Sequence, residues 1–143
     1  MARALYETDG DRARELAIAA RIGEFLCRGY TKLPINSGAD FLFSGPGKPD
    51  VAVEIKSRTT KSEKYPTYMV SRSKYDRLRG WSVLGCRAAL FVHWTDCIGY
   101  VMIPAPSVLF APGGRIDRGD ALDTGTMAYI PVGSFKSIGP GVL

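Results

Sequence analysis

Two short strand-like runs separated by a turn constrain the fold of this chain most. "ADFLF" (residues 39–43) and "DVAVEIKS" (residues 50–57) are rich in aromatic and β-branched residues. The six residues between them, "SGPGKP", contain two Gly and two Pro. Aromatic and β-branched side chains favour strands, whereas Gly and Pro favour turns. The pattern therefore predicts a β-hairpin over residues 39–57.

Helices and further strands are predicted on both sides of this hairpin. Residues 11–28 place apolar side chains at helical spacing, and Gly29 follows as the expected C-terminal stop. After the hairpin, a polar loop leads to four elements: a strand at 66–70, a helix at 71–81 with Ser71 as N-cap, and strands at 88–94 and 98–103. This order indicates one α/β domain over residues 1–143, with a central mixed β-sheet flanked by helices.

The C-terminal part of the chain has a different composition. Residues 104–143 are rich in Gly and Pro, with one strand-like run at 127–132. We expect an extension of loops and one edge strand that packs on the core. The Arg-Gly-Asp at residues 118–120 is interpreted as a polar turn, not as an adhesion motif.

Composition excludes several classes of protein. No apolar run approaches the roughly 20 residues of a membrane span, and the N-terminal residues become polar where a signal peptide would become apolar. Cys27, Cys86 and Cys97 form no C-x-x-C pair, and the chain has a single His. This set supports neither a disulfide framework nor a zinc site. We therefore expect a cytosolic protein whose cysteines are small core residues.

Positive charge is concentrated in one segment. Residues 56–87 carry nine Lys and Arg against two acidic residues, a net charge of +7, whereas the whole chain carries +5. Clustered cations of this kind are typical of proteins that bind a phosphate backbone. A solvated surface that only keeps the protein in solution is the alternative interpretation.

The second strand of the predicted hairpin carries chemistry on one face. Alternation directs Val51, Val53 and Ile55 to one side and Glu54 and Lys56 to the other. Glu54 and Lys56 would then stand about 6 to 7 Å apart along the strand. A carboxylate can bind a hard cation such as Mg²⁺, and a nearby Lys can orient or deprotonate a water and stabilise developing charge.

A magnesium site needs a second carboxylate. Asp50 lies on the same face as Glu54, but four strand residues separate them by about 13 Å. If Phe43 pairs with Val51, Asp40 lies opposite Glu54, with Cβ atoms about 4.5 to 5.5 Å apart. A slip of one residue would turn Asp40 away. The hairpin thus favours Asp40 as the partner of Glu54 and makes Asp50 the start of a strand.

Asp40, the turn and then Glu54-Ile55-Lys56 on the next strand resemble the PD-(D/E)XK nuclease superfamily. The similarity spans residues 11 to about 103, and it departs from the superfamily pattern at Ala39, where many members have Pro. The resemblance implies a restriction-endonuclease-like core. It also implies that Asp40, Glu54 and the main-chain carbonyl of Ile55 bind Mg²⁺ or Mn²⁺, while Lys56 serves the nucleophilic water.

Other residues are candidates by position. Members of the superfamily often carry a Glu in the first helix, and Glu15 lies at the edge of the apolar stripe of residues 11–28, so it could reach the metal or be a solvated helix Glu. Tyr65, Tyr68 and Tyr75 could stack on bases or pack in the core. Lys74 could reach the active site instead of DNA. The candidate phosphate contacts are Arg58, Lys61, Lys64, Arg72 and Lys74.

These expectations lead to a predicted function. The chain is expected to be a Mg²⁺-dependent endonuclease that hydrolyses DNA phosphodiesters, similar to phage DNA-processing nucleases or Holliday junction resolvases. A homodimer is expected by analogy, and a phage-encoded enzyme would act in the host cytoplasm. The alternatives are a non-catalytic nucleic-acid-binding protein that uses residues 56–87, and a subunit that needs a partner for activity.

Overall fold

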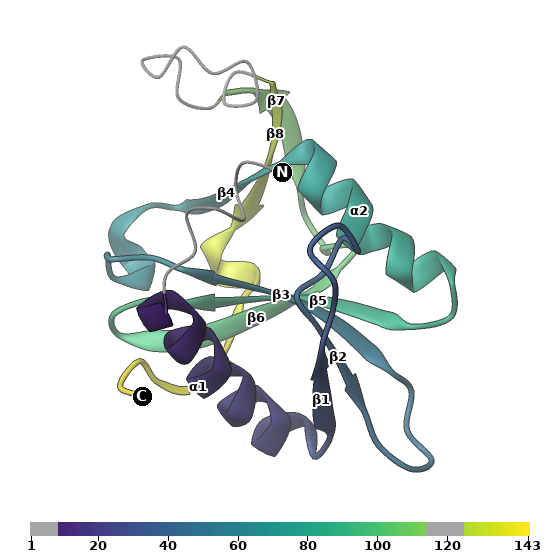
Figure 1. The fold of residues 1–143 in the computed structure, drawn as a ribbon. Coiled ribbons are helices and arrows are strands. Elements are labelled where there is room, and N and C mark those ends of the chain that lie inside the picture. Colours follow the sequence, from purple (N-terminus) through teal and green to yellow (C-terminus); the bar gives the residue numbers. More distant parts are fainter. Residues whose placement is uncertain (1–8, 114–124) are drawn as a thin grey trace.

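The structure, a computed structural model, describes residues 9–113 and 125–143 (Figure 1). The predicted turn at residues 118–120 lies outside them. The described elements are two 3-10 turns at Ser62–Lys64 and Val132–Ser134, together with α1 (Asp9–Leu26), β1 (Gly29–Lys32), β2 (Phe41–Ser44), β3 (Val51–Ser57), β4 (Thr67–Ser71), α2 (Arg72–Val83), β5 (Arg87–His93), β6 (Cys97–Ile103), β7 (Leu109–Pro112), β8 (Thr126–Pro131) and β9 (Lys136–Pro140). No helix in the described part of the chain is long and apolar enough to cross a membrane.

The predicted hairpin is confirmed. β2 and β3 pair antiparallel, with Phe43 opposite Val51 and Phe41 opposite Val53, which is the inferred register. Gly47 in the turn has a φ of 70°, a conformation that Gly adopts without steric cost. In this register, the residue before Phe41 comes alongside the segment that follows Val53.

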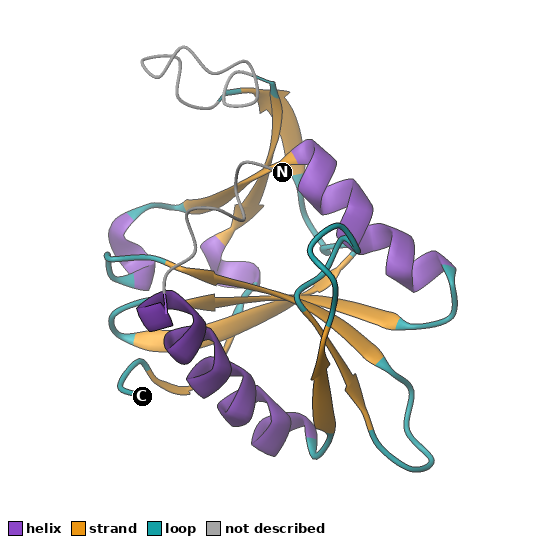
Figure 2. Ribbon diagram, viewed as in Figure 1, coloured by secondary structure: helices purple, strands orange, loops and turns teal. Residues whose placement is uncertain are grey.

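β3 lies in the interior of a mixed six-stranded sheet, as predicted (Figure 2). The strand order is β1-β2-β3-β5-β6-β9. β3 pairs parallel with β5, whereas the other neighbouring pairs are antiparallel. A parallel pair requires a long crossover connection, which β4 and α2 supply. The crossover brings α2 back over the sheet beside β3.

The two faces of this sheet are covered by different elements. α1 packs on one face, where its buried residues Ile18, Ala19 and Ile22 share a core with Val53 and Ile55. α2 and a second sheet cover the other face, which includes Ala52. The alternation predicted for β3 is therefore correct, and Glu54 and Lys56 lie on the α2 side.

The end of α1 differs from the prediction. The helix ends at Leu26, and Cys27, not Gly29, adopts the left-handed conformation with a φ of 55°. The Arg28 N–H donates to the Gly23 carbonyl at 3.0 Å, and the Cys27 N–H donates to Glu24 at 3.3 Å. These are the two bonds of a Schellman motif, in which the left-handed residue is usually Gly. The motif turns the chain directly into β1.

The prediction for the C-terminal segment was wrong in topology. The strand expected at 127–132 is present as β8, but it is the central strand of a second sheet, β4-β8-β7, and not an edge strand. The edge strand of the main sheet is β9, which pairs with β6. β1 and β9 escaped prediction because short edge strands exposed to solvent lack an alternating apolar pattern.

Candidate active site

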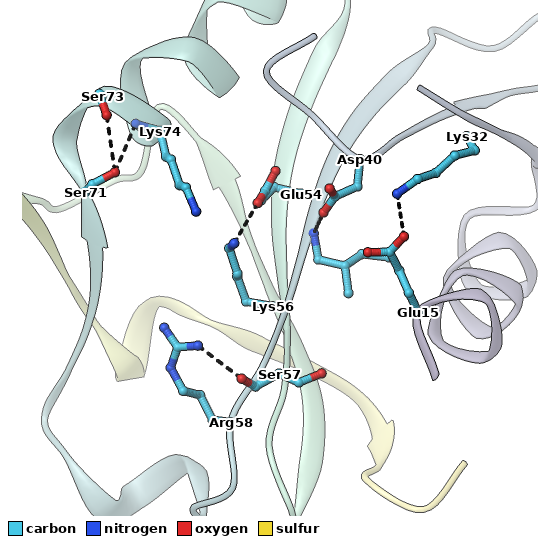
Figure 3. A network of polar contacts seen from close by, with 11 residues as sticks. Glu15, Lys32, Asp40, Glu54, Lys56, Ser57, Arg58, Ser71, Ser73 and Lys74 are labelled. Carbon is cyan, nitrogen blue, oxygen red and sulfur yellow. Dashed lines mark hydrogen bonds and ion pairs between the residues drawn. The ribbon is translucent and has the colours of Figure 1, made fainter. Parts of the chain in front are cut away.

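Asp40 lies where β2 begins, and its side chain reaches β3 (Figure 3). The Asp40 N–H donates to the Val53 carbonyl at 2.9 Å. Two residues further along β3, the Ile55 N–H donates to Asp40 Oδ2 at 2.8 Å. Main-chain groups of alternate residues point to the same side of a strand, so the Ile55 carbonyl also faces this edge. The Asp40 carboxylate thus accepts the hydrogen bond from Ile55, in the place where a main-chain carbonyl would accept it if the ladder between β2 and β3 continued.

Asp40 and Glu54 are close enough to repel each other. The pKa of Asp40 is raised from 3.8 to about 6, first by burial and then by the negative charge of Glu54. The hydrogen bond from Ile55 and the charges of Lys56 and Lys32 act in the opposite direction but do not compensate. A partly buried pair of carboxylates with this mutual repulsion is a ready acceptor of a cation.

Lys56 completes the E-x-K arrangement on β3. Its Nζ lies 3.1 Å from Glu54 Oε2, and both side chains are mostly buried. Burial lowers the pKa of Lys56, but the charge of Glu54 and hydrogen bonds outweigh it, so the pKa is raised. Lys56 is therefore an ammonium group in this structure, suited to orient a water or to stabilise negative charge.

Asp50, the second residue of the Pro-Asp pair before β3, takes part in strand pairing through its main chain. The Asp50 carbonyl accepts a hydrogen bond from the Arg87 N–H at 2.8 Å, at the first rung of the pairing between β3 and β5. Its distance from Glu54 along the strand is about 13 Å. Asp50 therefore lies immediately before β3, away from the acidic pair at the middle of the strand.

Glu15 comes near the site from α1 but is engaged with another residue. Its Oε1 lies 2.5 Å from Lys32 Nζ, and its side chain is 20% exposed. Among residues 9–113 and 125–143, no three Asp, Glu, His or Cys side chains are close enough to hold a metal together. Glu15 therefore does not join Asp40 and Glu54 in one three-carboxylate cluster. Its predicted catalytic role stays a prediction.

Two of the predicted phosphate contacts lie on the Glu54 side of the sheet. The Ser71 hydroxyl accepts from the Lys74 main-chain N–H at 3.3 Å, and this cap starts α2 with the Lys74 side chain directed toward Lys56 (Figure 3). The Arg58 guanidinium lies 4.6 Å from the ring centroid of Tyr68. Lys74 and Arg58 thus border the E-x-K pair from α2 and from the end of β3.

The other predicted phosphate contacts are Arg72, at the start of α2, and Lys61 and Lys64, in the loop after β3. Arg72 turns to the opposite side of α2, where its guanidinium stacks 4.2 Å from the Phe110 ring and pairs with Asp76 at 3.5 Å. Lys61 precedes the 3-10 turn in the loop after β3, and Lys64 is the last residue of that turn. That loop is held by Asp96, which accepts from the Ser62 N–H at 2.8 Å and from its hydroxyl at 2.7 Å.

The three tyrosines also take different environments. Tyr68 and Tyr75 are buried in the core on the α2 side, as the packing interpretation expected, whereas Tyr65 is 59% exposed. The Tyr68 hydroxyl is buried without a hydrogen-bond partner, and burial raises its pKa.

Sequence reasoning missed Lys32 because it missed β1. The strand is exposed along its length and has no alternating pattern. Lys32 pairs with Phe41 in the register with β2, and this placement brings its ammonium group to Glu15. The available signal was the Tyr30-x-Lys32 spacing before the hairpin, since a third antiparallel strand would align it with Phe43 and Phe41.

The donors at Asp40 fit a hard divalent cation. Two carboxylates converge there, the charge of one disfavours ionisation of the other, and the Ile55 carbonyl faces the same edge. Oxygen donors of this type suit Mg²⁺ and Mn²⁺, which keep part of their water shell when few protein ligands are present.

The fold matches that of a known nuclease. The chain is similar to the solved structure of Hjc from Archaeoglobus fulgidus, described as a Holliday junction resolvase from an archaeal hyperthermophile. The TM-score is 0.56 at 15% identity, and the match covers 92% of this chain and 93% of that chain. No curated protein matches the sequence. Together with the acidic pair and the E-x-K strand, this fold defines a nuclease of the PD-(D/E)XK class.

The family follows from the sequence model. A family described as "Phage putative PDDEXK endonuclease" matches residues 1–138, and the chain belongs to this family. The resemblance drawn from Asp40, Glu54 and Lys56 is thereby confirmed.

Proposed function

We propose that this endonuclease hydrolyses DNA phosphodiesters with Mg²⁺ or Mn²⁺ bound at Asp40 and Glu54. The observation that carries the proposal is the partly buried pair of repelling carboxylates beside the Lys56 ammonium. A structural role alone gives no reason to place Asp40 beside Glu54 in a partly buried site, because ionisation of Asp40 there costs folding free energy.

Each residue has a distinct task in the proposed reaction. Asp40, Glu54 and the Ile55 carbonyl hold the cation, which when bound supplies Lewis-acid activation of water and of the phosphodiester. The Lys56 ammonium orients the attacking water and donates a hydrogen bond to the developing negative charge on the scissile phosphate. Lys74, from the first turn of α2, lies beside Lys56 and can donate a hydrogen bond to the same phosphate.

The basic segment provides the DNA contacts. Arg58 and Lys74 border the acidic pair, and we assign them to the phosphates nearest the scissile bond. Lys61 and Lys64 contact the strand further along, in a loop held in place by Asp96. Arg72 contacts a more distant phosphate. These contacts position the backbone without reading bases.

We propose branched DNA as the substrate and a homodimer as the active form. The support is the likeness in fold to Hjc, which is described as a Holliday junction resolvase. A two-fold dimer places two sites so that both strands of a symmetric substrate are cut. A host-cell cytoplasmic location belongs to the same proposal for a member of a phage family.

Cleavage assays test the proposal. Wild-type protein should nick supercoiled plasmid with Mg²⁺ or Mn²⁺ and not with EDTA. Lys56→Met should lose cleavage and retain gel-shift binding, whereas Asp50→Asn, the matched carboxylate control on the same strand, should retain both. Binding without cleavage by the wild type in either metal would favour the non-catalytic alternative.

A panel of DNA structures tests the substrate assignment separately. Single-stranded, linear, nicked, flap and four-way junction DNA are compared at equal concentration. Preferential, paired cleavage of the junction supports the branched-substrate assignment. Equal rates on all duplex forms contradict it and leave the nuclease assignment intact.

A further inference from the structure

A second lysine lies on the side of Asp40 that faces away from Glu54 (Figure 3). Lys32, on β1, forms an ion pair with Glu15 of α1 at 2.5 Å. The Lys32 side chain is 46% exposed and that of Glu15 is 20% exposed, so the carboxylate is the more enclosed partner. The pair does not belong to the E-x-K arrangement, because it approaches Asp40 from the α1 side of the sheet.

Strand pairing fixes where Lys32 points. It lies directly opposite Phe41 in the register of β1 and β2, so both side chains project from the same face. Its Nζ lies 4.9 Å from the centroid of the Phe41 ring, a cation–π contact. Phe41 is fully buried under α1, on which Glu15 is carried. The ammonium is therefore positioned between the helix and the start of β2.

The charge of Lys32 also reaches Asp40, where it favours the ionised carboxylate. The positive charge of Lys32 thus attracts two of the three carboxylates around the site, Glu15 and Asp40. The positive charge of Lys56 attracts Glu54 and Asp40. A second divalent cation between Asp40 and Glu15 would have to displace this ammonium or lie against it. The described residues offer no three-carboxylate cluster that could compensate for that repulsion.

We propose that Lys32 is a built-in counter-cation for Glu15, and that the site consequently takes one divalent cation, held at Asp40 and Glu54. Glu15 is then a positioning residue that holds Lys32 beside Asp40, and it is not a metal ligand. This inference rests on the proposed function, because it specifies how many cations the same site binds.

Metal counting on the full-length protein without DNA tests the inference. Bound Mn²⁺ is measured by titration calorimetry, and free Mn²⁺ is measured by electron paramagnetic resonance. The wild type should bind one Mn²⁺ per chain. Lys32→Met keeps the aliphatic stem over Phe41 but leaves Glu15 without its cation, and it should bind two. The double variant Lys32→Met/Glu15→Gln should return to one.

Lys48→Met is the matched lysine control. Lys48 lies in the β2–β3 turn and donates to the Cys27 carbonyl at 3.0 Å, remote from the acidic pair, so this variant should bind one Mn²⁺. Circular dichroism confirms that every variant is folded before its metal content is compared.

Four results would overturn parts of the proposal in distinguishable ways. Two Mn²⁺ per wild-type chain, or a single Mn²⁺ in Lys32→Met, overturns the counter-cation role and leaves the nuclease proposal standing. A second Mn²⁺ that survives Glu15→Gln in the double variant also overturns it. No Mn²⁺ on a folded wild-type chain overturns the metal site of the proposed function itself.

Discussion

Replacing Asp40 by Asn should make the metal-free protein more stable at neutral pH while abolishing cleavage. The folded state raises the pKa of Asp40 from 3.8 to about 6, because the ionised carboxylate is partly buried next to Glu54. A shift of this size corresponds to up to about 3 kcal/mol lost when Asp40 ionises in the folded protein. Asn keeps an oxygen that accepts from the Ile55 N–H and carries no charge.

The sign of the pH dependence follows from the raised pKa. Between pH 3.8 and about 6 the folded protein binds more protons at Asp40 than the unfolded chain does. The stability that the protonated carboxyl provides is fully present below pH 3.8 and is lost as the pH rises through 6. Asn is not subject to this loss, so the advantage of Asp40→Asn over wild type should grow from pH 4 to pH 7 and then level off.

Urea denaturation in EDTA at pH 4, 5, 6 and 7.5 measures this difference. The variant should gain up to about 3 kcal/mol at pH 7.5 and little at pH 4. Asp50→Asn, the control, should change stability by less than about 0.5 kcal/mol. If Asp40→Asn gained no unfolding free energy at pH 7.5, or gained the same amount at every pH, the ionised Asp40 would not destabilise the folded protein and the reasoning would be refuted.

Metal addition gives the complementary result. A cation that binds only the folded state stabilises it by about 2.7 kcal/mol at 100 times its dissociation constant. Saturating Mg²⁺ should therefore stabilise the wild type and remove most of the advantage of the Asn variant. Equal stabilisation of both proteins by Mg²⁺ would mean that the cation binds elsewhere.

Three further predictions concern Lys56, Lys74 and the helix glycines. Lys56→Met removes the ammonium that pairs with Glu54 at 3.1 Å, so the metal-free variant should be less stable than the wild type. Mg²⁺ should restore this stability, and urea denaturation with and without Mg²⁺ measures the difference. Lys74→Ala should reduce the slope of log affinity against log salt by roughly 0.9 on duplex DNA, because one phosphate contact is lost; an unchanged slope would remove Lys74 from the interface. Gly23→Ala should destabilise the folded protein by about 1 to 3 kcal/mol, since the new Cβ would lie 2.9 Å from the Arg28 carbonyl oxygen. Gly80→Ala on α2 has open space around the new Cβ and should stabilise the folded protein by roughly 0.5 to 1 kcal/mol. Thermal melts compare the two variants.

The centre of the fold and the acidic pair were predictable because they depend on local patterns. The hairpin turn fixes the register of Phe43 and Val51, and that register alone brings Asp40 beside the Glu54 segment. The alternation of β3 then decides that Glu54 and Lys56 share a face. Each step uses residues fewer than 20 positions apart.

The parts that were missed depend on distant pairing. β9 joins β6 across about 40 residues, and β8 pairs with β4 across about 60. Neither pairing leaves a periodic signal in short segments rich in Gly and Pro. Lys32 was missed for a different reason: β1 pairs with the neighbouring β2, but it is exposed along its length and has no alternating apolar pattern. The direction of the Lys32 side chain follows only once β1 is paired with β2, which aligns Tyr30 with Phe43 and Lys32 with Phe41.

The charges around Asp40 are the physical basis of the single cation that we propose. Glu15 is matched by Lys32 and Glu54 by Lys56, so each of these carboxylates already has its own ammonium partner. Asp40 has a hydrogen bond from Ile55 but no ammonium of its own, and its pKa is raised even though both lysines act on it. The uncompensated charge of the site is therefore centred on one carboxylate. In the proposed site, a single divalent cation at Asp40 and Glu54 would remove this charge and leave Lys56 free to act on water and phosphate. A second cation would meet only carboxylates that already have an ammonium partner.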